Sequence, residues 1–200
     1  MIISINQGVT RMPAWRMAQP VDFSLLDGEH IAIVGGNASG KSMFVDIITS
    51  AHPLLMTNVE YDFSPKTSKL ASDNIKYITF RDCYGGDSDR NYYLQQRWNQ
   101  HDIDENTPTV EKLLDEAYRV TGPDTEERRA MKEHLYDIFN LRYLLDKYII
   151  LLSSGELRKF QLAKTLMGDP RVLIMDNPFI GLDKENVIVS LKSDLKVSSQ

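Results

Sequence analysis

The stretch Gly35-Gly36-Asn37-Ala38-Ser39-Gly40-Lys41-Ser42 decides the fold of this chain. It follows a run of four apolar residues, 31–34, and it precedes a helical pattern whose apolar positions are Met43, Phe44, Ile47 and Ile48. A short, uninterrupted apolar run is typical of a strand that is buried on both faces of a sheet. The sequence therefore predicts a buried strand, a glycine-rich turn and a helix in direct succession.

The spacing of the glycines, the lysine and the serine is that of a phosphate-binding loop, G-x-x-x-x-G-K-[ST]. Gly35 and Gly40 let the backbone turn so that its N–H groups point at phosphate oxygens, and the helix adds the positive end of its dipole. Lys41 is expected to reach the β- and γ-phosphates of a nucleotide, and the Ser42 hydroxyl to ligate a bridging Mg²⁺. The alternative is a plain turn between strand and helix, which does not require a Lys-Ser pair at its end.

A second apolar run, residues 172–175, ends in Asp176. Many buried strands end in Asp because of turn geometry, so this pattern is weak when taken alone. An acidic strand end beside a phosphate loop holds Mg²⁺ through water in nucleotide-hydrolysing proteins. In combination with the loop, Asp176 is therefore a candidate metal-binding residue.

The spacing of apolar residues predicts the other strands and helices, and with them the fold class. Alternation predicts two half-buried antiparallel strands, with inward positions at Val21, Phe23 and Leu25 and at Val59, Tyr61 and Phe63. Helical spacing predicts two helices separated by residues 121–124, with apolar positions at Val110, Leu113, Leu114, Ala117 and Tyr118 and at Met131, Leu135, Ile138 and Phe139. We expect an α/β fold with a mainly parallel core sheet, an antiparallel β flank and a helical insert at about 105–165.

Composition limits the function classes. The 200 residues contain 23 Lys and Arg against 28 Asp and Glu, a formal net charge of −5 that argues against nucleic acid as a partner. The alternative, a stacking surface for nucleic acid at Tyr92, Tyr93 and Trp98, is disfavoured by this charge. The chain has a single cysteine, Cys83, and lacks the roughly 20-residue apolar run of a membrane span, so we expect a cytoplasmic protein.

The tetrapeptide Ser153-Ser154-Gly155-Glu156 matches the helix capping box S-x-x-E and precedes an apolar helical face. A well-capped helix is the simplest interpretation. However, the order of phosphate loop, helical insert, this tetrapeptide, acidic strand and Gly181-Leu182-Asp183 resembles the ATP-binding cassette (ABC) ATPases from about residue 2 to 183. More narrowly, residues 77–82, 94–99 and 175–183 resemble the first cassette of tandem ABC ATPases described as photorepair or molybdate-transport ATP-binding proteins.

The resemblance implies the fold of a P-loop NTPase, with residues 1–200 as one ATP-binding domain that takes ATP and Mg²⁺. It implies a head-to-tail partner cassette, in tandem or as a homodimer, and a membrane permease that would bring the chain to the inner membrane. It also implies that the helix after Ser153 points at an ATP held by the opposite cassette. The implied nucleotide-binding residues are Gly35, Gly36, Asn37, Ala38, Ser39, Gly40, Lys41, Ser42, Met43, Gln95, Gln96, Ser153, Gly155 and Glu156.

Among these residues, the resemblance assigns Mg²⁺ to Ser42, Asp176 and Gln95, and catalysis to Lys41, Asp176 and Asn177. The family's Q-loop glutamine corresponds to Gln95 or Gln96, although counting from the strand at 75–80 instead gives Arg81. The adenine-stacking aromatic of the family falls near Thr10 or Arg11, where no aromatic residue stands, and Trp15 is out of register. We therefore expect adenine to contact aliphatic side chains and Arg11.

The chain departs from the family pattern at Asn177, where most active members have a glutamate that polarises the attacking water. An amide cannot accept a proton, and loss of a general base costs about 10²–10⁴ in rate.

The family's switch histidine and closing strands are also expected beyond Asp183, where few residues remain. We therefore expect the cassette to be C-terminally incomplete. Two hypotheses follow, ATP hydrolysis at a composite dimer site and a clamp that binds ATP without hydrolysing it. A P-loop kinase or GTPase, the third, lacks a substrate- or guanine-reading motif.

Overall fold

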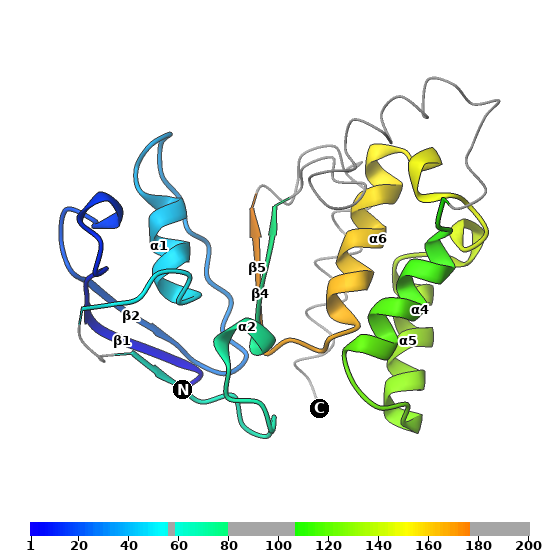
Figure 1. Cartoon of the computed structure of the whole chain (residues 1–200), viewed down its shortest axis with the longest axis horizontal. Helices are drawn as coiled ribbons and strands as arrows, with labels where there is room; N and C mark the ends of the chain where they lie inside the picture. Colours follow the sequence, from blue (N-terminus) through cyan, green and yellow to red (C-terminus); the bar gives the residue numbers. More distant parts are fainter. Residues whose placement is uncertain (56–58, 80–106, 177–200) are drawn as a thin grey trace. The chain divides into compact units, whose positions relative to one another are not determined.

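The computed structural model describes residues 1–55, 59–79 and 107–176, and all structural statements below concern these residues (Figure 1). The chain divides into two compact units, Met1–Ile75 and Lys76–Gln200. The boundary between the units falls at the start of strand β4 (Ile75–Thr79).

The first unit is built on an antiparallel sheet of three strands in the order β2-β1-β3. β1 (Ile3–Gly8) lies between β2 (Val21–Leu25) and β3 (Val59–Tyr61), and Ile3 is paired with both Leu25 and Tyr61. A short 3₁₀ helix, η1 (Pro13–Trp15), lies between β1 and β2, and a one-turn helix, α2 (Ala71–Asn74), precedes β4. The alternating patterns thus correctly predicted two antiparallel strands.

Helix α1 (Lys41–Ile48) packs against this sheet. Ile47 and Ile48 are buried, as is Ile3 of β1. The ring of Phe44 meets that of Phe23 on β2 edge to face, with 5.3 Å between the ring centroids. The packing fixes α1, and therefore the start of the helix at Lys41, relative to the sheet of its own unit.

Residues 31–34 are not a strand in the structure, so the prediction of a buried strand there is wrong. Ile31 and Ile33 are 46% and 41% exposed, and Val34 is 92% exposed. Neither sheet of the described chain includes the segment. An apolar run can form a buried strand only when neighbouring strands supply hydrogen bonds and apolar cover. In the described residues β4 pairs with β5 and not with this run.

The second sheet consists of β4 and β5 (Val172–Asp176), which run parallel (Figure 1). The strand predicted before Asp176 is therefore confirmed. Its expected burial on both faces is not found, because residues 172–174 are half-buried and Met175 is 40% exposed. A sheet of two strands leaves β5 with a single hydrogen-bonded neighbour, so it lacks the cover that a central strand receives.

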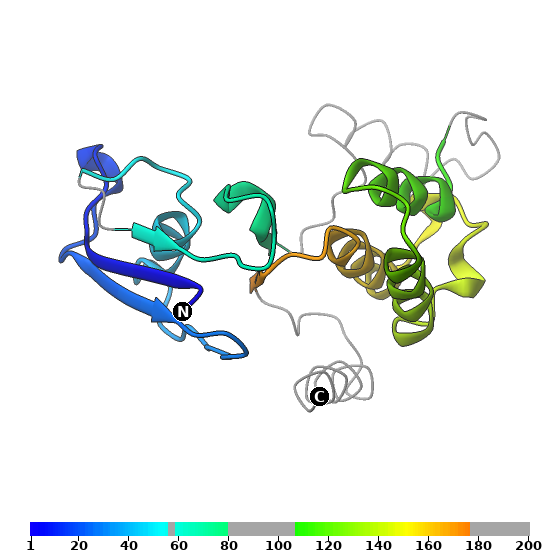
Figure 2. The same ribbon diagram turned by 90° about the horizontal axis from the view of Figure 1, so that it is seen from below.

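In the described residues of the second unit, α4 (Val110–Val120), α5 (Glu126–Ile138) and α6 (Ser154–Leu166) pack together (Figures 1 and 2). The short 3₁₀ helices η2 (Arg142–Leu144) and η3 (Ile149–Leu151) connect α5 to α6. The predicted apolar positions Leu114 and Leu135 are buried, together with Leu144, Leu157 and Met167. The helical periodicity therefore correctly predicted α4 and α5 and the faces they bury. Within the described part of the chain, no helix is both long and apolar enough to cross a bilayer.

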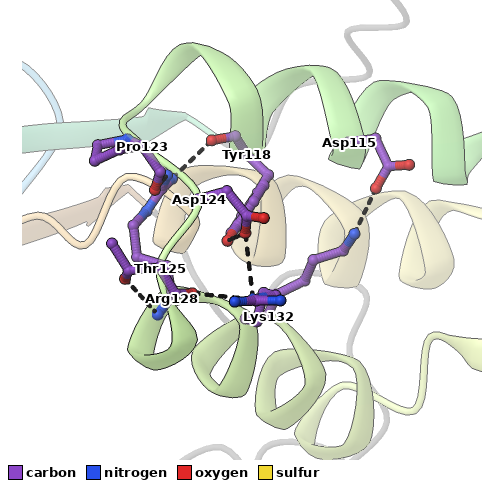
Figure 3. A network of polar contacts seen from close by, with 8 residues as sticks. Asp115, Tyr118, Pro123, Asp124, Thr125, Arg128 and Lys132 are labelled. Carbon is purple, nitrogen blue, oxygen red and sulfur yellow. Dashed lines mark hydrogen bonds and ion pairs between the residues drawn. The ribbon is translucent and has the colours of Figure 1, made fainter.

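A polar network ties the ends of these helices together (Figure 3). The guanidinium of Arg128 donates to the carbonyl oxygens of Pro123 at 2.8 Å and Tyr118 at 2.7 Å. The hydroxyl of Thr121, which follows α4, donates to the carbonyl oxygen of Met167 at the end of α6, at 3.1 Å. Carbonyls at helix ends have no intrahelical donor, so these side chains supply donors to partly buried carbonyls at the ends of α4 and α6.

Candidate functional site

The glycine-rich loop of residues 35–40 forms a tight turn before α1. Gly40, which precedes the first helical residue, has a left-handed backbone with φ of 90°, and Ala38 has φ of 60°. The Ser39 N–H donates to the carbonyl oxygen of Gly36 at 3.3 Å. A Cβ atom at Gly35 would lie 2.6 Å from the Ser39 Oγ, so the turn leaves no room for a side chain there unless Ser39 moves. The left-handed backbone thus requires a glycine at position 40, whereas a side chain at position 35 would require the Ser39 hydroxyl to move.

Lys41 folds back over this loop. Its Nζ donates to the carbonyl oxygens of Gly35 at 2.9 Å and Gly36 at 2.7 Å. An ammonium has three N–H donors, so these two contacts leave one for an acceptor outside the loop. The lysine therefore places a positive charge above the turn while it also holds the turn closed.

The start of α1 differs from the starts of α4, α5 and α6. Each of these three helices has a Ser or Thr whose side chain accepts from a first-turn N–H, and each has a Glu in its first turn. Helix α1 has Gly40 at the cap position, no side-chain cap and no acidic residue in its first turn, and it begins with a lysine. A cation at the positive end of a helix is unfavourable unless an anion compensates it, and the first-turn N–H groups have no intrahelical acceptor. This arrangement fits a bound phosphate.

The candidate Mg²⁺ ligands are an alcohol and a carboxylate. Ser42 is exposed in the first turn of α1, and Asp176 is the exposed last residue of β5. The two residues belong to different units. No group of three or more His, Cys, Asp or Glu side chains that could hold a metal occurs among the described residues. Mg²⁺ in nucleotide sites takes one or two protein oxygens and completes its shell with phosphate and water. Each residue therefore suits a Mg²⁺ that arrives with a nucleotide.

The start of α6 forms the capping box that the sequence predicted. Ser153 Oγ accepts from the Glu156 N–H at 3.3 Å, and Glu156 Oε2 accepts from the Ser153 N–H at 2.8 Å. Lys147, which sequence reasoning missed, donates to Glu156 Oε1 at 2.9 Å. Burial raises the pKa of Glu156, but the Ser153 N–H and the Lys147 ammonium outweigh it, so the pKa of this carboxyl is lowered. Glu156 is therefore an anion at neutral pH.

The predicted site residues fall into three groups in the described structure. Residues 35–43 lie together in the first unit, whereas Ser153, Gly155 and Glu156 lie together at the start of α6 in the second unit. Asp176 ends β5. Asn177, Gln95 and Gln96 lie outside the described residues.

The residues near the expected adenine position lie in the first unit. Thr10 is buried, and its hydroxyl donates to the carbonyl oxygen of Trp15 at 2.7 Å. The ring of Trp15 packs on His52, with 4.4 Å between ring centroids. Arg11 is exposed. Met17 was missed by sequence reasoning, since no spacing rule connects it to the loop, yet its Cε lies 3.3 Å from the position of a Cβ on Gly40.

Comparison with known proteins agrees with this geometry. Residues 18–180 match the family described as ABC transporter. An ABC transporter ATP-binding protein of Schizosaccharomyces pombe is 29% identical over 178 residues, which are 88% of this chain and 35% of the relative. The ABC transporter ATP-binding protein ModF of Escherichia coli is 29% identical over 186 residues, 90% of this chain and 34% of ModF. The chain thus spans about a third of the length of these curated relatives.

Solved structures show the same fold. A structure titled as the ATP binding subunit of an ABC transporter has a TM-score of 0.70 at 19% identity, and the match covers 98% of this chain and 76% of that one. The protein cbiO1 of Clostridium perfringens, part of an ABC transporter complex, has a TM-score of 0.67 at 19% identity, over 98% of this chain and 74% of that one. The α/β fold of a P-loop NTPase is thereby confirmed. With the family match over residues 18–180, the chain belongs to the ABC transporter family and has the nucleotide-binding P-loop fold of its ATPase cassettes.

Proposed function

We propose that this chain binds ATP with Mg²⁺ on the loop of residues 35–42. The triphosphate would lie against the N–H groups of the loop and the first turn of α1, with Lys41 beside the β- and γ-phosphates. Ser42 would contribute one oxygen to Mg²⁺, and Asp176 and Gln95 would complete its surroundings. The bound Mg²⁺ neutralises phosphate charge and orients the terminal phosphate.

The start of α1 is the observation that carries this proposal. Lys41 begins a helix that has no side-chain cap and no acid in its first turn, whereas α4, α5 and α6, the other helices of eight or more residues in the described part of the chain, all have both. An anion at this point supplies what the chain itself does not. Membership of the ABC transporter family supports the phosphates of ATP as that anion.

Calorimetric titration of the full chain with ATP tests nucleotide binding. We expect magnesium-dependent heat that EDTA removes, and an affinity at least about tenfold lower in Lys41→Ala, because a charged donor to phosphate is lost. Lys69→Ala, which removes an exposed lysine of the same unit, is the matched control and should bind as the wild type does. Equal affinities of wild type and Lys41→Ala would contradict the proposal.

We further propose that residues 1–200 act as one cassette, with a helical insert at about 105–165, that pairs head to tail with a second cassette. In this arrangement Ser153, Gly155 and Glu156 would face the ATP held on the partner's loop. The relatives LolD of Saccharophagus degradans and CysA of Shewanella oneidensis are named as ATP-binding proteins of a lipoprotein-releasing system and of sulfate/thiosulfate import. By analogy, a membrane permease is the second proposed partner, at the cytoplasmic face of the inner membrane.

Hydrolysis of ATP at the composite site is the proposed activity, and a clamp that holds ATP without hydrolysing it is the alternative. The amide of Asn177 favours the alternative, because it cannot act as a general base. Steady-state phosphate release distinguishes the two. The hydrolysis proposal expects release that Lys41→Ala abolishes and that Asn177→Glu increases by about 10² or more. Stable ATP-bound pairs without release would favour the clamp.

A further inference from the structure

The two carboxylate oxygens of Glu156 accept hydrogen bonds from two different partners. Its Oε2 accepts from the Ser153 N–H at 2.8 Å, which closes the capping box, and its Oε1 accepts from the Lys147 Nζ at 2.9 Å. The Glu156 side chain is 17% exposed and that of Lys147 is 41% exposed. One oxygen thus serves the cap of α6, and the other serves an ion pair with a residue outside this helix.

Lys147 is held in place independently of α6. Its N–H donates to the carbonyl oxygen of Leu144 at 2.9 Å, and its carbonyl oxygen accepts from the N–H of Val110, the first residue of α4, at 2.9 Å. Its ammonium also lies 5.3 Å from the centroid of the Tyr143 ring. These contacts anchor the lysine backbone to α4 and to the loop before α6, so the ammonium is positioned before any ligand arrives.

A carboxylate at this position opposes the proposed function of α6. Under that proposal the start of α6 faces the triphosphate of an ATP on the partner cassette, and a negative charge within several ångströms of it is repulsive. It also offsets the positive end of the helix dipole, which would otherwise attract the phosphates. A glutamine would close the same capping box without a charge. The chain therefore carries a charge that the cap does not require and that the ligand disfavours.

We infer that Lys147 is a positioning residue that neutralises Glu156 and so keeps the start of α6 able to receive a partner's triphosphate. The inference rests on the proposed pairing of two cassettes. If this is correct, Lys147 is needed only while residue 156 is a glutamate. Loss of the lysine should then be compensated by loss of the carboxylate charge.

Magnesium-ATP-dependent self-association of the full chain, followed by sedimentation, tests this coupling. At low salt, about 0.05 M KCl, we expect Lys147→Met to weaken association on the order of tenfold, and Glu156→Gln in the same chain to restore it to within about threefold. At about 0.5 M KCl the deficit of Lys147→Met should shrink, because salt screens the repulsion between the Glu156 carboxylate and the partner's triphosphate. Calorimetric affinity of the single chain for ATP should stay unchanged, since the loop of residues 35–42 is intact.

Lys132→Met is the matched control, because it breaks an ion pair of the same kind, Lys132–Asp115 at 2.6 Å, between α4 and α5. It should associate as the wild type does. A Lys147→Met deficit that persists at high salt, or that Glu156→Gln fails to relieve, would identify a structural role and overturn the inference. Wild-type association that Lys147→Met leaves unchanged also overturns it. Absence of ATP-dependent association in the wild type would instead refute the proposed pairing, and the inference with it.

Discussion

The Nη2 atom of Arg128 donates to the hydroxyl oxygen of Thr121 at 2.6 Å, which joins the first turn of α5 to the residue that follows α4. The same guanidinium lies 4.3 Å from the centroid of the Tyr118 ring. Because Thr121 also bonds to Met167, one arginine stabilises the junction of α4, α5 and α6. The positive charge of Arg128 therefore stabilises contacts among these helices.

Replacement of Arg128 by alanine should lower the free energy of unfolding by about 1.5–3 kcal/mol, because the variant leaves backbone carbonyls at the helix ends without a charged donor. Chemical denaturation followed by circular dichroism measures this. Arg129→Ala is the control, since Arg129 is 63% exposed and its Nε makes long contacts, to Asp124 at 3.5 Å and to the Thr125 carbonyl oxygen at 3.4 Å. The control should change stability by less than about 0.5 kcal/mol. Equal losses in the two variants would contradict the assigned role of Arg128.

The two adjacent serines at the start of α6 should differ in how much each contributes to stability. Ser153→Ala removes the side-chain acceptor of the Glu156 N–H and should cost about 1 kcal/mol of stability. Ser154 occupies the first helical position and is not the cap residue, so Ser154→Ala should be close to neutral. Thermal unfolding of both variants under identical conditions checks this difference. A larger loss in Ser154→Ala would show that the capping box is not what stabilises this end of α6.

Gly40→Ala should disturb the loop more than Gly36→Ala does. The φ of 90° at Gly40 is unfavourable for any residue with a Cβ and costs about 1–2 kcal/mol, whereas a Cβ at Gly36 meets nothing within 4 Å. Urea unfolding should therefore show a lower free energy of unfolding for Gly40→Ala, and a nearly unchanged one for Gly36→Ala. The reverse order would mean that the loop does not adopt this turn in solution.

Stability should depend on pH through Glu156. The pKa of this carboxyl is lower in the folded chain than in the unfolded chain. Its contribution is therefore fully present above the unfolded pKa, about 4.3, and is lost as pH falls through the folded value. Glu156→Gln should flatten the decline of the unfolding midpoint between about pH 5 and pH 3. Glu116→Gln, at an exposed position of α4, is the control and should keep the wild-type slope.

The features that local chemistry encodes were predictable from the sequence. The capping box at Ser153 and Glu156 depends on residues three positions apart, and it forms as predicted. The apolar spacing of α4 and α5 and the alternation in β2 and β3 likewise depend on the few residues of each element. The phosphate-loop motif marks the start of α1 at Lys41, and the structure begins the helix there.

Features that need a distant partner were decided by the tertiary structure alone. The apolar run 31–34 predicts a buried strand. It is exposed in the structure because no strand of the described chain pairs with it. The ion pair of Lys147 with Glu156 and the contacts of Arg128 at the helix ends join residues without any sequence signature. Apolar spacing and helix capping depend on residues within one element. Strand pairing and the pairing of charges depend instead on which distant segments come into contact in the fold. The sequence by itself therefore determined the elements and the family motif, and the fold decided their burial and their charge partners.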